Sequence, residues 1–374
     1  MREPIPKKYL QTCLSNSWGG LEMVAFELAC SFAEKGLNLT ILGFKNSPLQ
    51  KHCLEKGITF IPVDKSAGYF KRIRIIRQVI KSQNIDTLIL QKLPSLKFIV
   101  PATLFLKKQI RIYGFSHILI NVDKKDFLHK FLYARLTKIF SMTEIQSQRL
   151  LKHLPIKESQ IEIIPNWISK EKIKSSVPIN PTHMYKQFLN KTSKPNKFTA
   201  VMTSRLDPQK GQDLAIQAVY LLKKQGLDIQ LFIAGENTKN ELDFQTYLET
   251  LILRLNVQDS VFFLGYHENL FDIYKKADVL IVPSWEETFG RVIIEAMAVG
   301  LPSIASRAGG VPNIIQHQKN GLLFETKKPE ALTEQIFNYI KNSDLQQKIK
   351  SQCLIDSQKY SKEIIVNKLI EIVT

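Results

Sequence analysis

Short apolar runs separated by helical patterns recur along the chain of 374 residues, and this alternation constrains the fold most. A continuous run of four to six apolar residues is typical of a strand buried on both faces of a parallel sheet. In the amino-terminal half we predict strands at residues 9–14, 37–43, 58–63, 87–91, 110–115, 138–142 and 161–165. In the carboxyl-terminal half we predict them at 198–203, 230–234, 261–264, 279–282, 302–305 and 322–324. Helical patterns such as 21–34, 70–81, 127–136 and 143–153 lie between strands, so each half should be a doubly wound α/β sheet.

A polar stretch with Pro178, Pro181 and Pro195 interrupts the alternation. A chain of this length is typical of two domains. We therefore predict a first domain over residues 1–178, a linker over 179–197 and a second domain over 198–355. The last predicted segment, 356–374, is a helix that should cross back to the first domain.

The cysteines and the apolar segments indicate in which cellular compartment the protein is found. Cys13, Cys30, Cys53 and Cys353 are scattered without C-x-x-C spacing, which is typical of reduced thiols and not of a disulfide framework or a zinc site. The polar start does not resemble a secretory signal, and the apolar stretch 98–106 is too short to span a bilayer. We therefore expect a cytoplasmic protein.

The positive charge is concentrated in the first half. Residues 1–178 carry about +16 and residues 179–374 about +2 of the formal net charge of +18. Such a basic half favours an anionic membrane surface, a phosphorylated glycan or nucleic acid as partner. The basic helical pattern 70–81 could lie on the inner face of the plasma membrane or pack its apolar stripe on the sheet, and both interpretations stay open. Signatures of nucleic-acid binding motifs are absent from the sequence, so we expect no nucleic-acid partner.

Two glutamates eight positions apart, Glu287 and Glu295, follow a predicted strand and span the start of a predicted helix. Ligands of open α/β sheets bind at the carboxyl ends of the strands. Backbone N–H groups of Phe289, Gly290 and Arg291 at the helix start would favour an anion, and Glu295 could accept hydrogen bonds from sugar hydroxyls. This segment is therefore a candidate site for a phosphorylated sugar.

Two other loops carry groups that suit phosphate. Gly19 and Gly20 open the first predicted helix, where the backbone can approach a ligand closely, although a plain turn would have the same residues. The loop is not G-x-G-x-x-G, so no dinucleotide fingerprint is present. Arg205 and Lys210 follow the first strand of the second half. A planar guanidinium and a compact ammonium suit a diphosphate without a metal, although an exposed loop would also carry charges.

In this order the motifs resemble the retaining nucleotide-sugar glycosyltransferases of family 4 (group 1), over nearly the whole chain. The resemblance implies the GT-B fold, two Rossmann-like domains with a cleft between them. It implies a UDP- or GDP-linked sugar donor, a glycan or lipid-linked acceptor, and no cofactor or required metal. The implied roles are diphosphate binding by Arg205 and Lys210, contact with the donor sugar by Glu287, ribose binding by Glu295, backbone amides from Phe289, Gly290 and Arg291, phosphate approach at Gly19 and Gly20, and a histidine beside the sugar, His117.

His117 could equally be a buried, hydrogen-bonded residue. Some positions depart from the common family pattern, namely Ser204, Asn313 and the pair Asn166-Trp167, and these put the choice of sugar in doubt. Residues 118–136 and the basic first half resemble bacterial enzymes of lipopolysaccharide and envelope glycan synthesis, so we expect an acceptor of that kind. A same-fold sugar-nucleotide epimerase or glycan phosphorylase, and a non-catalytic anion- or nucleic-acid-binding protein, remain alternatives.

Overall fold

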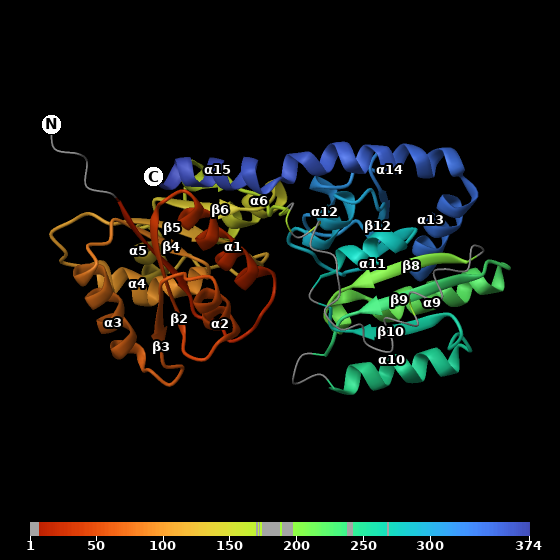
Figure 1. Cartoon of the computed structure of the whole chain (residues 1–374), viewed down its shortest axis with the longest axis horizontal. Helices are drawn as coiled ribbons and strands as arrows, with labels where there is room; N and C mark the ends of the chain where they lie inside the picture. Colours follow the sequence, from red (N-terminus) through yellow and green to blue (C-terminus); the bar gives the residue numbers. More distant parts are fainter. Residues whose placement is uncertain are drawn as a thin grey trace. The chain divides into compact units, whose positions relative to one another are not determined.

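The structure is a computed structural model that describes residues 7–169, 171, 173, 188, 197–237, 242–267 and 269–374. The chain forms two compact units (Figure 1). The first comprises Met1–Asn166 together with Glu363–Thr374, and the second comprises Trp167–Lys362. Most of the predicted linker 179–197 lies outside the described residues. Phe188, which is described, is buried and packs edge-on against Phe232 in the second unit, with ring centroids 4.8 Å apart.

The first unit contains a seven-stranded parallel sheet in the order β3-β2-β1-β4-β5-β6-β7. Its strands are β1 (Lys8–Cys13), β2 (Asn38–Phe44), β3 (Phe60–Val63), β4 (Thr87–Leu90), β5 (Arg111–Phe115), β6 (Lys138–Ser141) and β7 (Ile161–Ile163). Its α-helices are α1 (Gly20–Glu34), α2 (Pro48–Glu55), α3 (Tyr69–Ser82), α4 (Leu96–Thr103), α5 (Phe127–Tyr133), α6 (Glu144–His153) and α15 (Lys362–Val373). The predicted doubly wound sheet is confirmed for this half.

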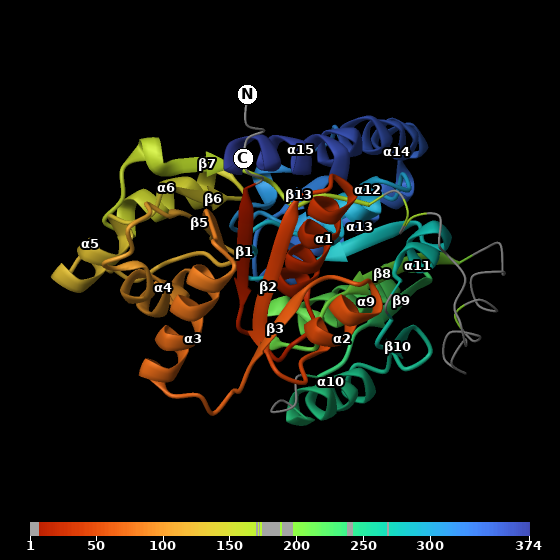
Figure 2. The ribbon, with the colours of Figure 1, turned by 60° about the vertical axis from the view of Figure 1, so that its left-hand side comes forward.

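Helices α3, α4 and α5 lie together beside the sheet (Figure 2). One hydrophobic cluster joins them to alternate residues of the strands, such as Leu10 of β1 and Ile112 of β5. Helix α3 contributes Ile76, Val79 and Ile80, all of which are buried. These three residues of α3 therefore pack in the core, as the interpretation in which the stripe packs on the sheet expects, while Tyr69 and Phe70 at the start of the helix are exposed.

Helix α15, at the end of the chain, belongs to the first unit. The hydroxyl of Tyr113 on β5 donates a hydrogen bond to the carbonyl oxygen of Ile372 at 3.0 Å. The ammonium of Lys368 lies 2.8 Å from a carboxylate oxygen of Glu162 on β7, and Lys138 of β6 contacts the other oxygen of that carboxylate at 3.1 Å. The last helix is thus fixed directly to β5 and β7 of the first sheet, and Lys138 of β6 shares its Glu162 partner.

The second unit contains a six-stranded parallel sheet in the order β10-β9-β8-β11-β12-β13. Its strands are β8 (Phe198–Thr203), β9 (Ile229–Ala234), β10 (Val261–Gly265), β11 (Val279–Val282), β12 (Ser303–Ser306) and β13 (Leu322–Phe324). Its described α-helices are α9 (Gln212–Lys224), α10 (Leu242–Arg254), α11 (Phe271–Lys276), α12 (Arg291–Met297), α13 (Pro329–Lys341) and α14 (Ser343–Ser357). This half too is the predicted doubly wound sheet.

Both sheets reverse their strand order at one place, between β1 and β4 in the first unit and between β8 and β11 in the second. At such a point the loops that follow the two neighbouring strands run to opposite sides of the sheet and leave a crevice, where ligands of open α/β sheets bind. In the part of the chain that the structure describes, no helix is long and apolar enough to cross a membrane.

Candidate active site

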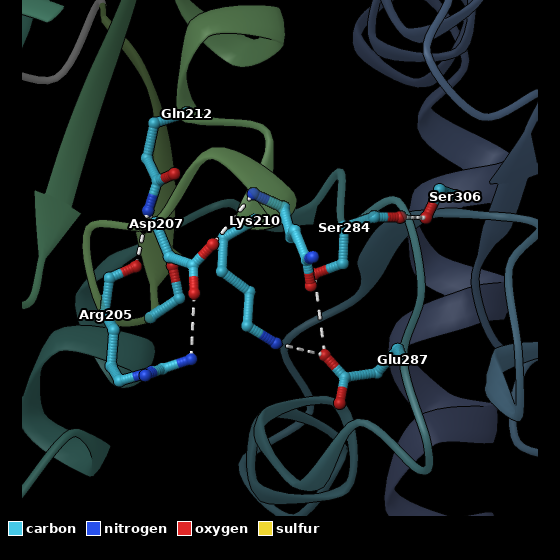
Figure 3. Close-up of polar contacts among 9 residues, drawn as sticks. Arg205, Asp207, Lys210, Gln212, Ser284, Glu287 and Ser306 are labelled. Carbon is cyan, nitrogen blue, oxygen red and sulfur yellow. Dashed lines mark hydrogen bonds and ion pairs between the residues drawn. The ribbon is translucent and has the colours of Figure 1, made fainter. Parts of the chain in front are cut away.

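The loops that follow β8 and β11 contact each other at the reversal point of the second sheet. The ammonium of Lys210, from the first loop, lies 2.7 Å from a carboxylate oxygen of Glu287 in the second, as Figure 3 shows. The backbone N–H of Trp285 donates to the carbonyl oxygen of Gln209 at 2.8 Å. Two of the residues that the sequence singles out are thus brought into direct contact, although they are 77 positions apart.

Gly211 allows this close approach of the two loops. It separates a short 3₁₀ turn, Pro208–Lys210, from α9, and its φ of +74° is in the left-handed region. A β-carbon added here would lie 2.4 Å from the carbonyl oxygen of Pro283, far inside van der Waals contact. Any larger residue would therefore push apart the loops that carry Lys210 and Glu287.

A third loop, which follows β12, holds the backbone of Glu287. The N–H of Gly310 donates to the carbonyl oxygen of Glu287 at 2.7 Å. Gly309 has a φ of +53°, and a β-carbon on it would lie 2.0 Å from the same oxygen. The hydroxyl of Ser306 donates to the carbonyl oxygen of Ser284 beside it (Figure 3). The pair Gly309-Gly310 therefore fixes the backbone of the loop that carries Glu287.

Arg205 is held within the loop that follows β8. Its guanidinium lies 2.9 Å from a carboxylate oxygen of Asp207, whose other oxygen accepts a hydrogen bond from the backbone N–H of Gln209. The side-chain amide of Gln212 donates to the carbonyl oxygen of Arg205 at 2.7 Å (Figure 3). The guanidinium itself is largely exposed, so a ligand at this strand end can reach it.

Glu295 forms a separate pair. Its carboxylate lies 2.9 Å from Nε of Arg291, one turn earlier on α12, and both side chains are largely buried. Gly290 precedes this helix, and Phe289 is buried and packs edge-on against Tyr360. The short helix is therefore anchored in the core, with its first backbone amides directly after the Glu287 loop.

The remaining predicted residues lie in the first unit. Nε2 of His117, just after β5, is 2.8 Å from Oε1 of Gln91, just after β4. Gln91 donates through Nε2 to Oε1 of Gln11 at 3.2 Å, and Gln11 donates to the carbonyl oxygen of Ala25 at 2.8 Å. A carbonyl oxygen only accepts, so each amide in this relay has one orientation. The relay therefore assigns the proton of His117 to Nε2 and leaves Nδ1 as an acceptor.

Burial, and to a smaller extent the ammonium of Lys92, lowers the pKa of His117 to about 3. The imidazole is consequently neutral at physiological pH. A neutral ring with a fixed tautomer can accept a hydrogen bond from a sugar hydroxyl at Nδ1, but it cannot act as a permanent positive charge.

The loop with Gly19 and Gly20 is already occupied by one internal anion. The carboxylate of Glu22 accepts a hydrogen bond from the N–H of Gly19 at 3.0 Å. Negative charge is favoured at this position because the amides at the start of α1 carry partial positive charge. A phosphate that binds to this loop therefore has to share it with Glu22.

Other reactive groups are poor candidates for catalysis. The four cysteines are free, and burial raises the pKa of the Cys13, Cys53 and Cys353 thiols to about 12. A protonated thiol is a weak nucleophile. Among the residues that the structure describes, no group of three or more His, Cys, Asp or Glu side chains is arranged to hold a metal ion.

Three polar residues that contact the site residues directly or through one another, Asp207, Gln11 and Gln91, were not predicted from the sequence. The two glutamines had a detectable signal, because each interrupts or ends a buried apolar strand. A polar side chain in such a strand needs an internal partner, which is often functional. Asp207 lies inside the motif that was noticed, but its pairing with Arg205 is a property of the folded loop.

Two doubly wound parallel domains are the architecture of the GT-B class of glycosyltransferases, and solved glycosyltransferase structures share this fold with the chain. Residues 185–353 match the family described as glycosyl transferases group 1, and residues 18–172 match glycosyltransferase family 4. The chain therefore belongs to the group 1 glycosyltransferases of family 4.

Individual proteins resemble the chain over nearly its full length. An uncharacterized glycosyltransferase of Haemophilus influenzae is 25% identical and the match covers 94% of this chain and 95% of that protein. A glycosyltransferase structure from Rickettsia africae is 22% identical, with a TM-score of 0.86 and 98% of each chain covered. HepE of Anabaena, solved with UDP and glucose, is 19% identical with a TM-score of 0.82, covering 98% of this chain and 99% of its own.

Another solved structure, WaaG, is described as a glycosyltransferase involved in lipopolysaccharide biosynthesis. It is 18% identical to this chain with a TM-score of 0.71, and the match covers 98% of this chain and 99% of WaaG. Similarity at this level shows that the fold is shared.

Proposed function

We propose that this glycosyltransferase moves a sugar from a UDP- or GDP-linked donor to a hydroxyl of a glycan or lipid-linked acceptor, with retention of the anomeric configuration. The contact of Lys210 with Glu287, at the reversal point of the second sheet, carries the proposal because it brings a cation for the diphosphate next to a carboxylate that can accept hydrogen bonds from a sugar. The HepE structures with UDP, glucose and UDP-glucose support a nucleotide-sugar donor.

The cations would act mainly on the leaving group. When the bond between the anomeric carbon and the donor phosphate breaks, its electron pair moves to the diphosphate, whose negative charge grows. Preorganised cations stabilise that charge more in the transition state than in the ground state. Lys210 would exchange part of its contact with Glu287 for a phosphate oxygen, and the exposed guanidinium of Arg205 would bind a second one.

The remaining predicted residues would position the donor. Glu287, freed from part of its contact with Lys210, would accept hydrogen bonds from the sugar, and Glu295 would bind the ribose. Amides of Phe289, Gly290 and Arg291 would bind sugar or phosphate. From the first unit, His117 would accept a sugar hydroxyl at Nδ1, and the loop of Gly19 and Gly20 would meet the phosphate.

The proton of the acceptor also needs a destination. In the reaction that we propose, the acceptor oxygen forms its bond to the anomeric carbon on the face that the diphosphate leaves. Its proton passes to an oxygen of the departing phosphate, so that no protein side chain serves as nucleophile. Arg205 and Lys210 supply positive charge at the diphosphate, and we expect turnover without an added metal ion.

We further propose that the acceptor is a bacterial cell-envelope polysaccharide or lipopolysaccharide, and that the protein acts in the cytoplasm at the inner face of the plasma membrane. The described function of WaaG supports the acceptor class. The excess of about +16 in residues 1–178 favours an anionic lipid surface.

A panel of sugar nucleotides, screened by thermal unfolding and followed by product analysis, tests the proposal. A donor that binds only the folded state raises the melting temperature. We expect one UDP- or GDP-sugar to do so, and its sugar to appear on the acceptor in the same anomeric form. Interconversion of the donor sugar without an acceptor would indicate an epimerase instead, and consumption of free phosphate a phosphorylase.

A further inference from the structure

The segment between β5 and β6 exposes an unusual number of large apolar side chains. On α5, Phe127 is 87% exposed and Leu128 is 60% exposed, and Phe131 is also exposed. In the loop that precedes α5, Ile118 and Val122 are exposed as well. Clusters of this kind on a soluble surface mark a contact with another molecule or with a membrane.

The geometry of α5 puts its apolar residues on one face. Phe127, Leu128 and Phe131 follow the i, i+1, i+4 spacing of a single helix face. Leu132 and Tyr133, which follow in the same helix, are buried in the core cluster with residues of α3 and α4. Helix α5 is thus anchored through Leu132 and Tyr133 while Phe127, Leu128 and Phe131 are exposed, and the helix lies at the edge of the first unit (Figure 2).

The segment is also held in shape. Asp126 caps α5 by accepting a hydrogen bond from the N–H of His129 at 3.1 Å. In the loop, the carboxylate of Asp123 lies 2.7 Å from Nδ1 of His153 on α6. The N–H of Lys124 donates to the carbonyl oxygen of His153 at 2.9 Å. The exposed apolar groups therefore sit on an ordered platform and need little ordering when they bind.

Basic side chains surround the apolar face. Lys125 and Lys130 are exposed, Lys124 is half-buried, and Arg135 is exposed just beyond the helix. These four cations outnumber Asp123 and Asp126, and they lie in the half of the chain that carries about +16. Exposed apolar groups with cations nearby in the chain match a bilayer with anionic headgroups, because the aromatic side chains enter the acyl boundary while the cationic groups meet phosphates.

We infer that residues 118–131 form a membrane-insertion segment, in which the Phe127–Leu128–Phe131 face of α5 enters the surface of an anionic bilayer. This inference rests on the membrane association in the proposed function and names the segment that carries it. It differs from the sequence-based interpretation of residues 70–81, because α3 packs three apolar residues in the core whereas α5 exposes three. A lipid bilayer fits better than a protein partner, because the apolar groups are exposed and four cations flank them in the chain.

The test is flotation of the full chain with vesicles of neutral phosphatidylcholine and with vesicles that contain about one third phosphatidylglycerol. We expect Phe127→Ser/Leu128→Ser to lower the partition coefficient on anionic vesicles about 100-fold, because two large apolar side chains lose their burial. Lys124→Gln/Lys125→Gln should lower it about 10-fold on anionic vesicles only. A single Phe127→Trp variant should be quenched by brominated acyl chains, which reports insertion directly.

Leu253→Ser/Ile355→Ser is the matched control, since these side chains are 68% and 60% exposed on α10 and α14 of the other unit. It should bind vesicles like the wild type. Equal vesicle binding by the wild type and by Phe127→Ser/Leu128→Ser would refute insertion by residues 118–131 but not membrane association of the protein. Indifference of the wild type to anionic vesicles would overturn both. The rise in melting temperature caused by the sugar nucleotide should be unchanged in all these variants. A failure of the proposed donor binding would therefore be distinguishable from a failure of the membrane segment.

Discussion

The imidazole of His117 donates through Nε2 to the side-chain oxygen of Gln91 at 2.8 Å, and Gln91 is itself fixed by Gln11. The relay continues to a backbone carbonyl of α1, so its direction is set by a group that cannot reverse. A ring whose ordinary tautomers are close in energy is thereby held in one of them. This holds Nδ1 ready to accept, which is the role that a sugar hydroxyl would require.

Replacing Gln91 should release that tautomer. In Gln91→Leu we expect the ¹⁵N signals of His117 to change from one tautomer to a mixture, and kcat to fall roughly tenfold with little change in donor KM. The buried amides left without partners should also cost about 1–3 kcal/mol of stability. Gln83→Leu, which removes a hydrogen bond to Thr40 on the same unit, is the control for stability alone. An unaltered His117 spectrum in Gln91→Leu would refute the relay.

The buried histidine should make the protein sensitive to acid. The unfolded chain protonates His117 near its ordinary pKa of 6.5, whereas burial keeps the folded pKa at about 3. The free energy of unfolding therefore falls as the pH drops below 6.5, and this loss levels off only near pH 3. At pH 4.5 it should amount to about 2–3 kcal/mol.

Denaturant unfolding of the wild type and of His117→Gln, measured from pH 8 to pH 4, checks this prediction. The variant lacks the titrating group, so its stability should decline less steeply between pH 6.5 and pH 4.5. Parallel pH profiles for the two proteins would show that His117 is not held neutral by the fold.

Removal of the site cations should slow the chemical step. We expect Lys210→Ala and Arg205→Ala each to lower kcat by about 10²–10³, which corresponds to about 3–4 kcal/mol of transition-state stabilisation. Lys223→Ala removes a cation paired with Asp259 at 2.8 Å on the surface of the same unit, and should leave kcat unchanged. Steady-state measurement of kcat for these variants, with the donor identified in the sugar-nucleotide panel, checks this prediction. Wild-type turnover in both site variants would exclude the proposed role of these cations.

Substitution of two glycines with nearly equal φ distinguishes the cost of backbone strain from the cost of pushing two loops apart. Gly211 and Gly226 have φ of +74° and +77°, but a β-carbon meets nothing within 4 Å at Gly226 and a carbonyl oxygen at 2.4 Å at Gly211. Gly226→Ala should cost about 1–2 kcal/mol for the left-handed conformation. Gly211→Ala should cost roughly 2 kcal/mol more and should also weaken donor binding, since the Lys210 and Glu287 loops must separate.

Calorimetry and donor titration of the two glycine variants give both readouts. At roughly 2–4 °C per kcal/mol for a domain of this size, the difference in melting temperature should be easily resolved. Equal melting temperatures and equal donor affinity would mean that the contact at Pro283 carries no constraint.

The strands of both sheets were predictable because a parallel strand buried on two faces is a short apolar run with polar loops on either side. Boundaries moved by one or two residues, as in the strand predicted at 58–63, which begins at Phe60. Helix α4 was not predicted: its nearly continuous apolar sequence with Pro101 has no 3.6-residue period. The helix expected at 127–136 ends at Tyr133, and a turn follows.

The site was predictable only in part. Motifs identified the loops, since Arg205, Lys210 and Glu287 each follow a strand end. Pairing of Lys210 with Glu287, and of Arg205 with Asp207, could not be read from the sequence, because it depends on how close the glycines let the loops approach. The assigned roles of these residues stay predictions until they are tested with a donor.

The placement of α15 has a consequence for how the chain is made. Because this helix completes the first unit after the second unit has intervened, Glu363–Thr374 must be synthesised before the first sheet gains its covering at Tyr113 and Glu162. During synthesis the second unit can fold while the first still exposes that side to chaperones. Tags or truncations at the carboxyl end should therefore impair the unit that is synthesised first.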